Sequence, residues 1–332
     1  MKKKALYALI LALMMTGCGS KGKTASTAAP APASGAESAA AAAPEPTEEA
    51  AVPAQNLSEA AESEAETVPD ELPVIPAEEI ELDDDVEAES DEYPDVSFTV
   101  KEYGTDEDGF YMTVELENES DRSISWQLLQ VSLNDLMCDP YWEYITDPGE
   151  ETETTIFWFN DLLEESHVGD VTKVQFDLVA ADAEDWEAEY FINGCYVFYP
   201  EGKAASRSDR GDVLDGDVLF NRDFGSMTVV DTEEEDGVLL MTVYLENRTE
   251  KSLAFSANNV AVNGYICDPY WMEEIGPGSG AYSVLAWDED MLAEYDLTAG
   301  DVTQIDLPLR VFDQGDLNAD FLLEETISYR ID

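Results

Sequence analysis

The chain has 332 residues, of which 75 are Asp or Glu and only 16 are Lys or Arg, so its formal net charge is −59 at pH 7. A protein this acidic repels phosphate backbones and anionic lipid headgroups, which excludes nucleic acid as a favourable partner. The acidic residues are spread along the chain from Glu37 onward, so the charge alone does not define a binding site.

The first 17 residues predict an export signal. Lys2, Lys3 and Lys4 precede an apolar run that extends from Ala5 to Met15. This run is too short for a transmembrane helix, which needs about 20 apolar residues. A basic start followed by a short apolar run is typical of a signal peptide, which is removed from the mature protein.

The signal ends in Met15-Thr16-Gly17-Cys18, which resembles the lipobox of bacterial lipoproteins. The resemblance implies cleavage before Cys18 and a diacylglycerol on its sulfur. More than one acyl chain gives stable membrane anchoring. We therefore expect lipidation of Cys18 and a location on the extracellular face of the cell membrane. An ordinary secretory signal with an incidental Cys is the alternative.

Residues 18–94 predict a disordered tether. The segment is rich in Ala and Pro at first and becomes acidic, with almost no aromatic residues. Such a composition cannot bury enough apolar surface to offset the conformational entropy lost on folding. A coil of this length spans roughly 45–50 Å. The tether would therefore hold the folded part away from the membrane.

The rest of the chain contains an internal repeat. Residues 116–142 align without gaps to residues 245–271, and both segments contain Cys-Asp-Pro-Tyr-Trp. After a two-residue insertion, Gly169–Thr172 match Gly300–Thr303. Each copy is long enough for a core of its own. We predict one domain over residues 95–200, a linker over residues 201–216 and a second domain over residues 217–332.

Apolar and polar residues alternate with a period of two inside each copy, for example over Met112–Leu116 and Ile305–Leu309. This period indicates antiparallel strands with one buried face. Asp-Gly and Pro-Gly pairs supply the turns between them. We therefore predict an all-β fold of two tandem immunoglobulin-like β-sandwiches, with a closed barrel as the alternative. One short helix is expected in each copy, at residues 160–165 and 288–294.

The second copy contains Leu245–Asn247, Val262–Tyr265 and Asp268–Trp271. This pattern resembles a repeat in surface lipoproteins of Clostridia-type Gram-positive bacteria. The first copy departs from the pattern at Leu133–Leu136. The resemblance implies an immunoglobulin- or telokin-like fold at the cell surface, and it implies no active site.

The repeated Cys-Asp-Pro-Tyr-Trp motif has two interpretations. As a scaffold, its Cys is the last inward residue of a strand that Pro ends, and the Tyr-Trp pair folds over the end of the sandwich. As a ligand platform, exposed rings would stack on a sugar. The candidate platform residues are Tyr141, Trp142, Trp158, Tyr270, Trp271 and Trp287. We favour the scaffold interpretation.

Three cysteines follow Cys18, and an odd number leaves at least one unpaired. We expect buried free thiols, with a Cys138–Cys195 disulfide as the alternative. There is no Cys-x-x-Cys pair, so no zinc or thiol-redox site is predicted.

The remaining candidates carry weak signals. The lone histidine, His167, has no sequence signature of a catalytic partner. The linker contains Arg210-Gly211-Asp212, which chance explains in a segment of this composition. An Asp-rich loop offers weak cation ligands, although it lacks the Gly and Glu that a calcium loop requires. The candidate ligands are Asp313, Asp316, Asn318 and Asp320.

These observations predict an extracellular, lipid-anchored binding or interaction protein that is not an enzyme. The expected partner is a glycan or an envelope protein whose identity the sequence does not give. A spacer within an envelope assembly is the second hypothesis, and a hydrolase is the third. No cofactor is predicted.

Overall fold

The structure is a computed structural model that describes residues 76–87, 96–185, 190–210, 216–316 and 318–331. The predicted signal peptide, Cys18 and the tether up to residue 75 lie outside these residues. Within the described part of the chain, no helix is long and apolar enough to cross a membrane.

The described residues form two β-sandwiches, each around a hydrophobic core of its own. The first sandwich comprises strands β1 to β10, and the second comprises β11 to β20. Each contains one short helix, α2 (Asn160–Glu165) in the first and α3 (Glu289–Ala293) in the second. The predicted all-β sandwich fold with two short helices is confirmed.

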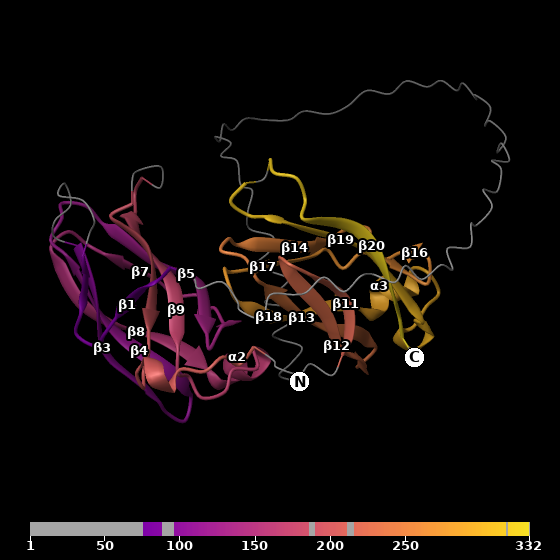
Figure 1. The fold of residues 1–332 in the computed structure, drawn as a ribbon, viewed down its shortest axis with the longest axis horizontal. Helices are drawn as coiled ribbons and strands as arrows, with labels where there is room; N and C mark the ends of the chain where they lie inside the picture. Colours follow the sequence, from indigo (N-terminus) through magenta and orange to yellow (C-terminus); the bar gives the residue numbers. More distant parts are fainter. Residues whose placement is uncertain (1–75, 88–95, 186–189, 211–215, 317, 332) are drawn as a thin grey trace, which may run out of the picture. The chain divides into compact units, whose positions relative to one another are not determined.

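The first sandwich has two layers (Figure 1). One layer has the order β2 (Asp85–Glu87), β3 (Val96–Thr105), β4 (Gly109–Asn118) and β8 (Glu150–Phe159). The other has the order β1 (Glu78–Ile80), β10 (Ile192–Phe198), β9 (Val174–Asp182) and β5 (Ile124–Leu133). Two short strands, β6 (Leu136–Met137) and β7 (Glu143–Thr146), also pair with β5.

The second sandwich is arranged in the same way, and Figure 1 shows β14 and β19 in one layer with β13 and β18 in the other. The latter layer has the order β11 (Asp217–Arg222), β12 (Gly225–Glu235), β13 (Val238–Asn247) and β18 (Gly280–Trp287). The facing layer has the order β16 (Tyr265–Ile266), β15 (Ala261–Val262), β19 (Gln304–Asp313), β14 (Leu253–Ala257) and β17 (Trp271–Ile275), and β20 (Leu323–Arg330) pairs with β19. One parallel residue pair, Gly280 with Leu136, connects β18 to β6.

The predicted alternation decides which side chains form the cores. In β4, Met112, Val114 and Leu116 are fully buried, whereas the residues between them are partly exposed. In β19, Ile305 and Leu307 are buried in the same way. Each buried side chain of this size contributes roughly 1.5–3 kcal/mol relative to an exposed one. The period of two therefore places every second residue of these strands in a core.

The predicted tether contains two strands that the sequence did not indicate. β1 pairs in parallel with β10, and β2 pairs with β3. Ile80 of β1 and Val86 of β2 are 5% and 6% exposed and belong to the first core. The prediction of disorder is therefore wrong for these two segments, because single apolar residues within the acidic run add to sheet edges that are already formed.

A buried asparagine closes one corner of each sandwich. Asn247 Nδ2 donates to the carbonyls of Lys251, Ile275 and Gly276, over 2.7–2.9 Å. Its side-chain oxygen accepts from the amide and hydroxyl of Thr249. Asn118 makes the equivalent contacts in the first sandwich. The shared Leu-Glu-Asn pattern is thus a structural corner that satisfies buried carbonyl groups.

Candidate functional site: an aromatic hollow on the second sandwich

The Asp of each Cys-Asp-Pro-Tyr-Trp motif fixes the backbone of the Tyr that follows. Asp268 Oδ1 accepts from the Tyr270 amide over 3.0 Å, and Asp139 Oδ1 accepts from the Tyr141 amide over 2.7 Å. Both tyrosines have left-handed backbones, with φ of +53° and +52°. This turn directs the two rings into water, where Tyr270 is 79% and Tyr141 78% exposed.

The tryptophans have the opposite environment. Trp158 and Trp287 are fully buried, and each indole N–H donates to the carbonyl of the motif Cys, at 2.9 Å to Cys138 and 2.8 Å to Cys267. Neither tryptophan can present a ring face to a ligand. The hypothesis of a platform that extends through these two residues is therefore wrong, and their role is to close the core.

The second residue of the Tyr-Trp pair also faces inward. Trp271 is 6% exposed, and its indole N–H donates to Ser283 Oγ over 2.9 Å. Trp142 in the first sandwich is half-buried and packs against the first core. Only the tyrosines of the six candidate platform residues are therefore fully open to solvent.

Tyr270 borders a hollow on the outer face of the second sandwich. The hollow has a volume of about 380 Å³, within the range of roughly 300–1,000 Å³ that is typical of small-molecule sites. It is lined by Ser256, Asn258, Tyr270, Trp271, Met272, Arg310, Phe312, Asp316, Ala319 and Phe321. The structure thus brings three sequence candidates, Tyr270, Trp271 and Asp316, together with residues that the sequence did not single out.

The floor of the hollow follows from strand register. Ser256 of β14 lies opposite Met272 of β17 on one side and Arg310 of β19 on the other. Directly opposed residues share one face of a sheet, so these three side chains form a row across the strands. Phe312 belongs to the next row on the same face, because residues two apart in a strand point to the same side.

The rim is built by the loop between β19 and β20. The Phe321 ring packs against Phe312, with centroids 5.8 Å apart in an edge-to-face arrangement, and the Arg310 guanidinium lies 5.2 Å from the Phe321 centroid. Arg310 also pairs with Glu324 at 3.0 Å. Phe321 remains 45% exposed. These contacts hold an aromatic face open towards solvent.

One half-buried carboxylate lies behind this surface. Glu273 of β17 accepts from Ser283 Oγ over 2.6 Å, and Ser283 in turn accepts from Trp271. Burial raises the pKa of Glu273, and the bond from Ser283 opposes that shift. The chain of contacts ties the indole of Trp271 to a titratable group.

The first sandwich does not repeat the hollow's chemistry. Strand register places Gln127 between Glu143 and Val179, at the positions of Ser256, Met272 and Arg310. Gln127 Nε2 donates to Glu143 Oε1 over 3.2 Å, so these polar groups satisfy each other. Among these equivalent positions, the arginine belongs to the second copy alone.

The Asp-rich loop does not gather its weak candidate ligands around one point. Asp313 pairs with Lys251, which lowers the pKa of that carboxyl, and accepts the Gly315 amide at 2.9 Å. Asp316 accepts from the Asn318 amide over 3.1 Å, as in an ordinary turn. Across the described residues, Asp313, Asp316 and Asp320 do not gather their carboxylates within reach of one ion. Asn318 and Asp320 are exposed.

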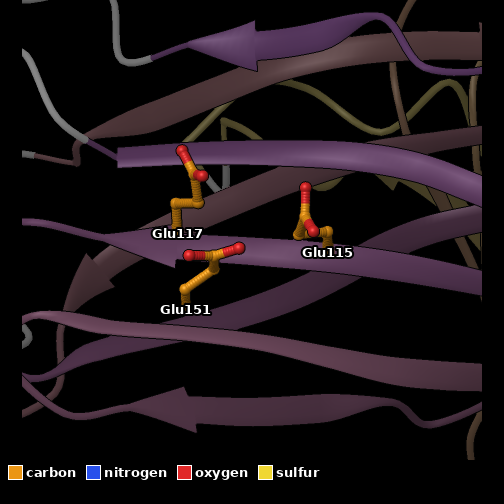
Figure 2. A group of neighbouring side chains, drawn as sticks. All are labelled: Glu115, Glu117 and Glu151. Atoms are coloured by element: carbon orange, nitrogen blue, oxygen red, sulfur yellow. The ribbon is translucent and has the colours of Figure 1, made fainter.

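A different acidic cluster lies on the outer face of the first sandwich. Figure 2 shows Glu115 and Glu117 of β4 beside Glu151 of β8, with carboxylate oxygens within 4.8 Å of one another. Lys101 pairs with Glu115 at 3.2 Å, and Ser97 Oγ donates to Glu117 over 3.2 Å. The cluster is consistent with a solvated acidic face that these neighbours partly neutralise.

The three cysteines that follow Cys18 are unpaired. Cys138 and Cys267 are buried, Cys195 is half-buried, and none of the three forms a disulfide. Burial raises the pKa of Cys138 and of Cys195 to about 12 in each case, so both remain thiols at neutral pH. The expectation of free thiols is confirmed for these three residues.

His167 and Arg210 have structural positions. His167 adopts a left-handed backbone directly after α2, and burial lowers the pKa of its imidazole. Arg210 is 7% exposed, pairs with Glu246 at 2.8 Å and also donates to the Gly278 carbonyl. An Arg held in this way cannot serve an exposed Arg-Gly-Asp ligand.

Comparison with known proteins does not identify a family. No family model matches the chain, and no curated protein matches it. Among solved structures, the exo-chitosanase CsxA of Amycolatopsis orientalis is 10% identical with a TM-score of 0.20, over 69% of this chain and 26% of the enzyme. Two complexes of variants of that enzyme with PNP-beta-D-glucosamine have the same identity and TM-score, over 64% and 66% of this chain. The chain spans about a quarter of the length of these enzymes, and a TM-score of 0.20 supports no functional comparison.

Proposed function

We propose that this chain is a lipid-anchored surface protein whose second sandwich binds a saccharide at the aromatic hollow. The observation that carries the proposal is the open ring surface of Tyr270 and Phe321 around the row of Ser256, Met272 and Arg310. Apolar ring faces beside a few convergent polar groups are the usual construction of small-ligand sites. The lipid on Cys18 and the tether would display this surface away from the membrane.

The surrounding charge restricts the class of saccharide. The chain carries a net charge of −59, and the guanidinium of Arg310 is already paired with Glu324. An anionic sugar would therefore meet repulsion without a free cation at the hollow. Asn258, Ser256 and Asp316 offer hydrogen-bonding groups at the lining. These features favour a neutral or cationic saccharide.

Binding without catalysis is part of the proposal. The serine in the lining is Ser256, and a serine nucleophile needs an adjacent general base. The sole histidine of the chain, His167, belongs to the first sandwich. The hollow therefore offers surface and hydrogen bonds, and its serine has no histidine base within the second sandwich.

A glycan array with the purified full-length chain tests the proposal. Tyr270→Ala and Phe321→Ala should each weaken binding of the captured glycan at least about tenfold, which corresponds to roughly 1.4 kcal/mol. Tyr141→Ala is the matched control, because Tyr141 is equally exposed in the same turn of the first sandwich. Equal losses in all three variants, or no captured glycan, would contradict the proposal.

A further inference from the structure

The two sandwiches differ at one sheet edge. In the first, β1 pairs in parallel with the outer side of β10, with Glu79 opposite Val197 and Ile80 opposite Phe198. In the second, β20 occupies the position of β10, and it pairs with β19 alone among the strands that the structure describes. Each side of a strand carries backbone donors and acceptors, so the outer side of β20 presents a row of them to solvent.

The side chains near this edge are more deeply buried in the first sandwich, where β1 is present, than in the second. Tyr196 and Phe198 of β10 are 5% and 3% exposed. Ile327 and Tyr329 occupy the same positions in β20, and both are only half-buried against the second core. An additional strand beside β20 would cover these side chains, as β1 covers those of the first sandwich.

The backbone geometry identifies the residues at the open edge. The Ile331 amide donates to the Thr303 carbonyl over 3.1 Å, and the pairing continues from Gln304 with Arg330 along the strand. In an antiparallel pair, the residues that exchange hydrogen bonds alternate along each strand. Tyr329 and Ile327 therefore bond to β19, whereas the backbone groups of Ser328 and Thr326 point outward.

We propose that the outer edge of β20 accepts an extended, cationic segment of a partner protein as an additional strand, parallel to β20, in the position that β1 has on β10. Such addition of a strand gives affinity through main-chain hydrogen bonds and specificity through alternate side chains. Apolar side chains at every second position of the segment would cover Ile327 and Tyr329.

The negative charge of the chain favours a cationic partner segment. The chain's net charge of −59 repels a second copy of itself and any other acidic segment. A hollow of about 390 Å³ lies at the start of β20, and its lining includes Glu324, which pairs with Arg310 at 3.0 Å, and Glu325, which pairs with Arg222 at 3.6 Å. A Lys or Arg side chain on the added strand would join these surface ion pairs, and the net negative charge of the chain would attract it. This hollow adjoins the saccharide surface proposed above and shares Asn258 and Arg310 with it, but the addition of a strand does not depend on saccharide binding.

The test uses the full-length chain and a fluorescein-labelled nine-residue peptide of alternating lysine and valine. The wild-type chain should bind this peptide saturably. Ser328→Pro should weaken binding at least tenfold, because Pro removes an outward donor without removing a bond to β19. Ser328→Ala is the matched control. It loses the 2.5 Å hydroxyl contact with Asp306, keeps the amide and should bind like the wild type.

A second peptide makes the test independent of protein folding. Methylation of alternate backbone nitrogens keeps the charge and the side chains of the peptide but removes its donors on one side. The methylated peptide should bind the wild-type chain at least tenfold more weakly than the parent peptide. Equal binding of the two peptides would show charge attraction alone and would overturn the proposal, as would equal binding by the Pro and Ala variants or no saturable binding.

Discussion

Adjacent residues of the Cys-Asp-Pro-Tyr-Trp corner have opposite roles. In the second sandwich, the Asp268 carboxylate holds Tyr270 in a left-handed turn, which places the next residue, Trp271, at the inward start of β17. The indole is buried and hydrogen-bonded, whereas the phenol ring is in solvent. The same five residues thus supply both a piece of core and an exposed ring.

This contrast predicts different effects on stability. Trp271→Ala should lower the free energy of unfolding of the second sandwich by about 3–5 kcal/mol, since it leaves a cavity at a buried aromatic position. Tyr270→Ala should change it by less than about 0.5 kcal/mol, as surface substitutions usually do. Urea unfolding of the full-length chain, followed by circular dichroism, measures both. A neutral Trp271→Ala would show that the indole does not contribute to the core.

The carboxyl group of Glu273 predicts a pH-dependent stability. Because burial raises its pKa in the folded state, Glu273 contributes stability that is present below the unfolded pKa and is lost as the pH rises through the folded pKa. Glu273→Gln should therefore increase the unfolding free energy relative to the wild type near pH 7, and the gain should disappear as the pH falls to about 4.

Unfolding midpoints over this pH range measure the effect of Glu273→Gln. The control is Glu250→Gln, because Glu250 is an exposed carboxylate in the turn before β14. Removal of any one of 75 acidic groups reduces repulsion, and Glu250→Gln measures that general contribution. If the gain in unfolding free energy depended on pH equally in Glu273→Gln and Glu250→Gln, burial of Glu273 would not be its cause.

At the scale of single elements, the edge strands predict a difference in amide hydrogen exchange. Val197 lies opposite Glu79 of β1, and its counterpart Ser328 has no strand on its outer side among the described residues. In the free chain, the Val197 amide should exchange at least about ten times more slowly than the Ser328 amide, because exchange requires β1 to open first. Exchange followed by NMR spectroscopy measures both.

Release of β1 supplies the control for this prediction. Ile80 is the buried residue of β1, so Ile80→Asp should detach the strand and accelerate exchange at Val197, whereas Ile80→Val should preserve both. Exchange at Ser328 should be the same in all three proteins. Protection of Ser328 equal to that of Val197 would mean that the edge of β20 is already covered.

Sequence patterns predicted the elements where local rules dominate. The alternation over Met112–Leu116 identified β4, because every second residue had to enter a core. The Asp288 carboxylate caps α3 by accepting the Met291 amide, which is the sort of local contact that a sequence reveals. β1 and β2 each contain only a single buried apolar residue within an acidic segment. Composition therefore predicts disorder there, and the sequence places both strands in the tether.

The candidate site was less predictable, because exposure depends on the whole sheet. The tryptophans were candidate platform residues because they are large and aromatic, yet Trp158 and Trp287 are core residues. Arg310 and Phe321 were missed, since neither belongs to a repeated motif. One signal was available: alignment of the copies through their two-residue insertion places Arg310, one of only 16 basic residues, opposite Val179. A difference between otherwise similar copies can thus indicate a site better than their identities.

For the whole molecule, the proposed anchoring makes a direct prediction. Cys18→Ala should move the protein from the membrane fraction to the medium or leave it with its signal peptide attached, because no acyl chain can be added. Metabolic labelling with a palmitate analogue, followed by fractionation, measures this. Cys195→Ala is the control and should keep its label. A label that persists in Cys18→Ala would show that the lipid is not attached to Cys18 and would contradict the proposed anchoring.

The parallel pairing of β1 with β10 has a mechanical consequence for such an anchored protein. A chain held at its N-terminal lipid and at a ligand further along is under tension, which enters the first sandwich at β1 and leaves it after β10. Because these strands are parallel and directly paired, the pull slides one along the other and loads their three residue pairs at once. In the part of the chain that the structure describes, the edge of β20 carries no strand, so the second sandwich has no such clamp there. We therefore expect it to unravel at lower force than the sandwich next to the membrane.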